Sequence, residues 1–137
     1  MWEALLTALP VAFGGALGAV GRHGVMVAVQ RVPGSEGWWA VLLANVLGCA
    51  LIGALIGWLA AFPAAIAPPF ALAERPLLRG MLVTGLCGAL TTFSAFSLDN
   101  GILALEGRYR AVALNVGLSL GVGLGATYLA LTLGSAP

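Results

Sequence analysis

The sequence predicts an all-α membrane protein with four transmembrane helices. Of its 137 residues, 61% are hydrophobic and 8% are charged, whereas a soluble domain carries about 25% charged residues. The mean hydropathy is +1.03. Long segments carry no Asp, Glu, Lys or Arg: 4–21, 38–73, 80–98 and 111–137. Because a helix needs about 20 apolar residues to cross a bilayer, we expect one domain with spans near 4–29, 38–61, 78–103 and 111–133.

The connections between these spans are short or apolar. Residues 31–37 are rich in Pro and Gly and predict a turn. Trp38 and Trp39 follow, and we expect them to anchor the second span at the membrane interface. Residues 62–76 form an apolar connection interrupted by prolines.

Glu3 precedes the first span with no basic residue, so a cleaved signal peptide is not expected. The protein is expected to remain in the plasma membrane, in contact with the lipid bilayer.

The arginines do not favour one orientation of the chain. An even number of spans places both termini and the 62–79 connection on one side of the membrane. Arg75 and Arg79 lie on that side, while the other side has three: Arg31, Arg108 and Arg110. Because a Lys/Arg excess normally sets orientation, this balance predicts insertion both ways and pairing as an antiparallel dual-topology homodimer. The alternative is that one or two arginines suffice to fix one orientation.

Glycines recur four residues apart in three of the spans. They are Gly14 and Gly18; Gly53 and Gly57; and Gly117, Gly121 and Gly125. Small residues at this spacing allow helices to approach closely in lipid. The pattern favours oligomerisation, although packing within one subunit explains some of these glycines equally well.

Composition argues against two classes of function. The net charge is +1 and there is no Lys, so nucleic-acid binding is not expected. The single His23 lies on a different span from Ser94 and Ser97, and there is no nucleophile elbow, so no enzyme is expected. The two cysteines form no CxxC motif, which predicts buried, reduced thiols.

Two polar residues stand within apolar spans. Arg22 is costly at membrane depth unless it faces protein, water or an anion. It either extends to the interface or supplies a positive charge to an aqueous vestibule, where it would attract anions. Asn45 lies seven residues into the second span. Its amide either joins helices or offers N–H donors to a passing ion.

The third span contains an unusual run of small and hydroxyl-bearing residues from Gly85 to Ser97. A break in the backbone at membrane depth is tolerated only inside protein or beside water, so we expect a broken helix that lines a passage or an interface. Phe93 and Phe96 share a helix face. Such a pair usually meets lipid or core, but a positive ring edge can also stabilise a small anion. Carbonyls freed near Gly88 and Thr91 would suit a hard cation.

The fourth span carries a polar stripe at steps of four residues: Asn115, Ser119, Gly123 and Thr127. Its hydroxyls either bond back to the carbonyl four residues earlier or form a row of donors along the helix.

Together these motifs resemble the Fluc (CrcB) fluoride-channel family across all four spans. The resemblance rests on Gly14–Arg22, on Asn45 followed by Gly48, on Ser119 and above all on Gly88–Ser97. It implies passive fluoride export by a dual-topology homodimer with two antiparallel pores. It implies a fluoride pathway of Asn45, Thr92, Phe93, Ser94, Phe96, Ser119 and Thr127. It also implies Arg22 at the vestibule and a central structural sodium ion at the dimer interface, bound by the Gly88 and Thr91 carbonyls of both subunits.

The sequence departs from the family pattern at five positions: Ala89, Ala95, Asp99, Asn115 and Gly123. Gly123 leaves the detail of the polar stripe open.

A small multidrug-type exporter is one alternative to a fluoride channel, but it needs a membrane-embedded carboxylate, and here Glu3 is terminal and Asp99 lies near a span end. A structural subunit is the other, and it does not account for Arg22 and Asn45.

Overall fold

The computed structural model describes residues 2–61 and 76–134, and these residues are helical apart from short connections. Three helices are continuous: α1 (Trp2–Gln30), α2 (Gly37–Ala61) and α6 (Tyr109–Gly134). The third span has four consecutive parts: α3 (Pro76–Arg79), the π-helical η2 (Gly80–Cys87), α4 (Gly88–Leu90) and α5 (Phe93–Leu105). The described part of the chain thus contains four helical segments long and apolar enough to cross a membrane. This confirms the all-α prediction and the predicted number of spans.

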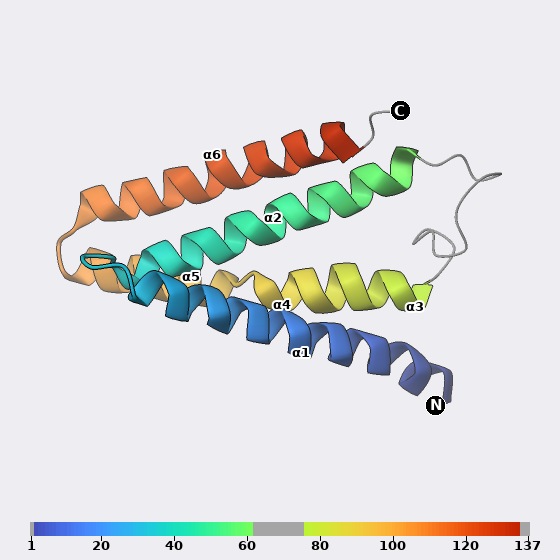
Figure 1. The fold of residues 1–137 in the computed structure, drawn as a ribbon. Coiled ribbons are helices and arrows are strands. Elements are labelled where there is room, and N and C mark those ends of the chain that lie inside the picture. The colour runs from blue at the N-terminus through green and yellow to red at the C-terminus, as the bar shows by residue number, and fades with distance from the viewer. Residues whose placement is uncertain (1, 62–75, 135–137) are drawn as a thin grey trace.

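The four spans run alongside one another (Figure 1). They converge where the 31–36 and 106–108 connections lie, and they spread apart at the end that carries both termini. α2 packs chiefly along α6, and α1 packs chiefly along η2 and α4. Both termini lie at one end, as an even number of spans requires. Arg75, which entered the predicted arginine count, lies outside the described residues.

Glycines make the two main helix contacts possible. A Cβ on Gly14 or Gly18 would collide with the backbone of η2, at Met81 and Leu86. A Cβ on Gly53 or Gly57 would likewise collide with backbone carbonyls of α6. Lipid offers little hydrophobic drive for helix association, so such close packing supplies it instead. These glycines therefore serve packing within one chain.

The remaining glycine set has a different environment. A Cβ on Gly117, Gly121 or Gly125 of α6 would meet nothing within 4 Å in residues 2–61 and 76–134. One face of α6 is consequently smooth and open in the single chain.

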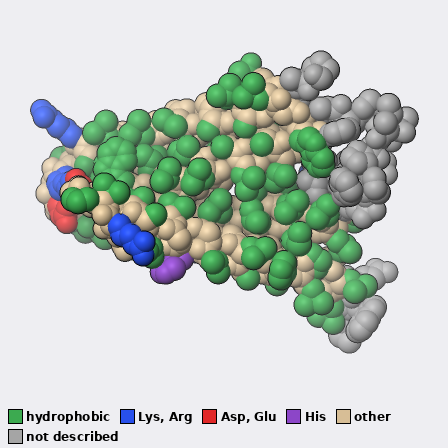
Figure 2. All heavy atoms as spheres, viewed as in Figure 1, with side chains coloured by type: hydrophobic (Ala, Val, Ile, Leu, Met, Phe, Trp, Pro, Cys, Tyr) green, Lys and Arg blue, Asp and Glu red, His purple; other side chains and the backbone are tan. Residues whose placement is uncertain are grey.

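The outer surface is apolar along its length. Large side chains such as Leu9, Val20 and Leu124 are 66–71% exposed, and hydrophobic side chains cover much of the face seen in Figure 2. In that view the charged side chains gather at the end with the short connections. Of the two predicted interface anchors, Trp39 is exposed, but Trp38 is only 6% exposed and packs in the core with Leu42 and Leu103.

Candidate functional site

The third span breaks at Thr91 and Thr92. α4 ends at Leu90, and the next two residues are extended, with φ/ψ of −83°/158° and −153°/118°. β-Branched residues tolerate extended backbone well. The Thr92 hydroxyl then caps α5 by accepting the Ala95 N–H at 3.2 Å, as an N-cap threonine does. The predicted break in the third span is confirmed.

Asn45 of α2 holds this break in place. Its Oδ1 accepts the backbone N–H of Thr92 at 2.8 Å, and its Nδ2 donates to the Thr92 carbonyl at 3.3 Å. The side-chain amide thereby satisfies backbone groups that hydrocarbon would leave unpaired. Of the two predicted roles for Asn45, joining helices is observed. Because the amide has two N–H groups, one remains to serve as a donor.

The break also changes which carbonyls have donors. In an unbroken helix the Thr92 N–H would bond to the Gly88 carbonyl, and the Ala95 N–H to the Thr91 carbonyl. Here these donors turn to Asn45 Oδ1 and Thr92 Oγ1. The Gly88 and Thr91 carbonyls thus lose their usual partners, and such oxygens suit a hard cation.

An uncharged groove of about 330 Å³ lies beside the break. It is lined by residues of α2, the break, α5 and α6: Asn45, Cys49, Thr91, Thr92, Phe93, Phe96, Ser119 and Leu120. Five of the seven residues predicted for the fluoride pathway therefore come together. The Phe93 and Phe96 ring centroids are 6.0 Å apart, with planes tilted by 37°. Phe93 is 79% exposed, so one side of the groove is open in the single chain.

The direction of α5 gives the groove a positive potential. α5 begins at Phe93, so the partial positive charge of its N-terminus lies beside the groove. Among the described residues, none of those that line the groove carries a charge. An anion at this place meets a helix dipole, amide and hydroxyl donors, and aromatic rings.

A chain of side-chain hydrogen bonds continues from the groove between α5 and α6. Ser119 Oγ donates to Asn115 Oδ1 at 3.4 Å, and Asn115 Nδ2 donates to Asn100 Oδ1 at 3.2 Å. Asn100 Nδ2 in turn donates to the Phe96 carbonyl at 2.9 Å. Asn115 is completely buried. Asn100 is not among the residues predicted from the sequence, although an amide one turn after Phe96 in an apolar span is a usable signal.

Three predicted residues do not line this groove. The Thr127 hydroxyl bonds to the Cys49 carbonyl at 3.2 Å and to the Gly123 carbonyl at 3.1 Å, so the back-bonding alternative describes it. The exposed Ser94 hydroxyl lies 3.2 Å from Thr92 Oγ1. Arg22 lies on α1, which contributes no residue to the groove lining. Their roles in the pathway stay predictions.

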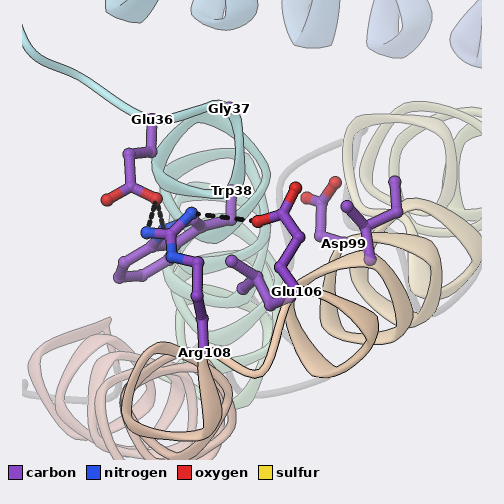
Figure 3. Close-up of a pocket in the computed structure, with 8 residues that line it drawn as sticks. Glu36, Gly37, Trp38, Asp99, Glu106 and Arg108 are labelled. Carbon is purple, nitrogen blue, oxygen red and sulfur yellow. Dashed lines mark hydrogen bonds and ion pairs between the residues drawn. The ribbon is translucent and has the colours of Figure 1, made fainter.

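A second cavity, of about 250 Å³, lies at the end of the bundle with the short connections. Figure 3 shows Arg108 reaching toward Glu36 and Glu106. Arg108 pairs with Glu36, and its distance to Glu106 is 3.4 Å. The hydrogen bond with Arg108, helped by one from the Trp38 indole, lowers the pKa of Glu36. The ion pair therefore ties the two short connections together.

Asp99 also lines this second cavity. One of its carboxylate oxygens is inaccessible and has no hydrogen-bond partner within residues 2–61 and 76–134. Figure 3 places its carboxylate near Glu106 in projection.

Comparison with known proteins shows the family of this chain. Residues 9–131 match the family model described as CrcB-like protein, Camphor Resistance (CrcB). The chain belongs to the CrcB family. A protein of Hyphomonas neptunium named fluoride-specific ion channel FluC is 39% identical over 125 residues, which cover 90% of this chain and 91% of that protein. A protein of the same name from Rhizobium johnstonii is 41% identical over 120 residues, covering 88% and 87%.

The CrcB match extends into all four spans and includes the described residues that line the groove. With its four apolar spans, this CrcB-family chain is a multi-pass protein of the cell membrane.

Proposed function

We propose that this protein is a fluoride channel that lets fluoride leave the cell passively and so limits its cytoplasmic toxicity. The observation that carries the proposal is the uncharged groove, which is lined by amide and hydroxyl side chains and by two phenylalanines near the start of α5. The names of its CrcB-family relatives support the same function.

The groove suits the demands of a small, strongly hydrated anion. Removing fluoride from water costs a large desolvation free energy unless hydrogen bonds replace part of the hydration shell. Asn45 and Ser119 offer donors, and the rings of Phe93 and Phe96 offer positive edges. Without a fixed positive side chain in the groove, binding stays weak enough for release, as conduction requires. A negative-inside potential helps efflux by about 2.3 kcal/mol per 100 mV.

We further propose that two chains pair as an antiparallel dual-topology homodimer. The open side of the groove at Phe93 and the smooth face of α6 at Gly117, Gly121 and Gly125 support this, since both offer a second chain close contact. The balance of arginines favours insertion in both orientations. Cysteine accessibility from each side of the membrane tests this: both orientations are expected in equal amounts, and a single orientation would contradict it.

A structural sodium ion is proposed for the Gly88 and Thr91 carbonyls. These oxygens lose their usual helical donors at the break, which supports their use as cation ligands. The ion would supply positive charge that holds the broken segment. Replacing sodium with N-methylglucamine is expected to reduce the thermal stability of the purified protein. Unchanged stability would argue against the ion.

Growth of cells that lack their own fluoride exporter tests the function. Expression of this chain is expected to restore growth in fluoride, whereas a Phe96→Leu variant expressed at the same level should restore growth only at lower fluoride concentrations. The small multidrug-type exporter would instead restore growth in toxic organic cations, and a structural subunit would restore neither.

A further inference from the structure

We propose that Asn100 is a positioning residue of the fluoride path. Through Asn115 it fixes the hydrogen bonding of Ser119, so that the Ser119 hydroxyl donates to a passing anion and then returns to Asn115. The inference rests on the proposed function and concerns a residue that does not itself line the groove.

The Phe96 carbonyl determines which atom donates in each hydrogen bond of this series. The Phe96 carbonyl can only accept, so Asn100 must turn its Nδ2 toward it, at 2.9 Å. Asn100 Oδ1 is then left facing α6, where it accepts from Asn115 Nδ2 at 3.2 Å. Asn115 must therefore present its oxygen, and not its NH2 group, to Ser119. One backbone carbonyl thus orients two amides in succession.

The last bond in the chain is the weakest. Ser119 Oγ and Asn115 Oδ1 are 3.4 Å apart, beyond the usual range of about 2.5–3.0 Å for an O–H···O bond. Ser119 also lines the groove. Turning the Ser119 proton from Asn115 to an anion in the groove therefore costs little free energy. Once the anion leaves, the buried Asn115 oxygen draws the proton back, because a buried acceptor without a donor is unfavourable.

Without the Asn100 amide, the Ser119 proton would no longer return to the Asn115 oxygen after the anion leaves. Without its acceptor, the Asn115 amide is free to rotate and to offer Nδ2 to Ser119 Oγ. The Ser119 proton would then point permanently into the groove. Fluoride would bind more tightly and leave more slowly.

The test measures fluoride efflux from liposomes as a function of fluoride concentration. Relative to wild type, Asn100→Leu is expected to lower both the maximal rate and the half-saturating concentration, each by roughly three- to tenfold, the equivalent of about one hydrogen bond. Asn100→Gln, which keeps the amide, should restore both values toward wild type. Leu105→Ala on the same helix, at a side chain that is 92% exposed, serves as the matched control.

A double-mutant cycle separates positioning from simple helix contact. In a Ser119→Ala background, Asn100→Leu is expected to have no further effect on either value. An equal effect in both backgrounds, or an unchanged half-saturating concentration, would show that Asn100 only joins α5 and α6 and would overturn the inference. Should Asn100→Leu not fold, Asn100→Ala enters the same cycle. Absence of fluoride flux in wild type would instead overturn the proposed function.

Discussion

Replacing Asn45 by leucine tests how the helix break is held. The change keeps the side-chain volume similar but removes the hydrogen bonds of 2.8 and 3.3 Å to the Thr92 backbone. Each buried group left unpaired costs about 1–3 kcal/mol in water-soluble proteins. In membranes the measured value averages about 0.6 and reaches about 1.7 kcal/mol, because the unfolded state also finds partners. Because Asn45 lies within a span, the membrane values apply, and the two bonds together predict a loss of about 1–3 kcal/mol.

Asn45→Leu should also reduce transport, by an amount that can be measured separately from stability. Asn45→Leu removes a donor from the groove and loosens the start of α5, which carries Phe93 and Phe96. We expect fluoride efflux to fall on the order of tenfold, the value of about 1.4 kcal/mol. Thermal unfolding in detergent and efflux from liposomes measure the two effects separately. Leu47→Ala, at an exposed position of α2, is the control. Wild-type efflux and stability in Asn45→Leu would refute the reasoning.

Three further predictions concern the groove, the packing and the ion pair. Phe96→Leu keeps an apolar side chain but removes the ring edge, so efflux should fall about tenfold while folding is kept; unchanged efflux would contradict a role for the ring. Gly57→Val should destabilise the protein by about 1–3 kcal/mol through overpacking against α6, whereas Gly121→Val, in open space, should leave the stability of the monomer fold unchanged. The pKa of Glu36 is lowered in the folded state, so its stabilisation is present above its ordinary pKa and is lost as pH falls through the folded value; Glu36→Gln should remove this acid-dependent part of thermal stability, and an identical pH profile would contradict it.

The sequence was a good guide wherever one physical requirement dominated. Membrane thickness and the spacing of charges predicted four spans, and the helices lie where those spans were expected. The small and hydroxyl-bearing run in the third span predicted a break, and the break occurs at Thr91 and Thr92. Asn45, Phe93 and Ser119 were predicted to act together, and they line one groove.

Other features depend on partners that sequence spacing does not reveal. The burial of Trp38, for example, depends on its packing with Leu42 and Leu103. Thr127 has the same four-residue spacing as Ser119, but its hydroxyl finds carbonyls on both α2 and α6. Asn100 is placed in the hydrogen-bond series by Asn115, which donates to it across the contact between α5 and α6. No motif within α5 alone predicts this contact.

The most direct test of the central claim is fluoride efflux from liposomes that contain the purified chain, with valinomycin to carry potassium. Chloride efflux and efflux under an imposed proton gradient are measured in parallel. The account predicts rapid fluoride release, little chloride release and no dependence on the proton gradient. A folded protein that releases no fluoride, or releases fluoride and chloride alike, would contradict it.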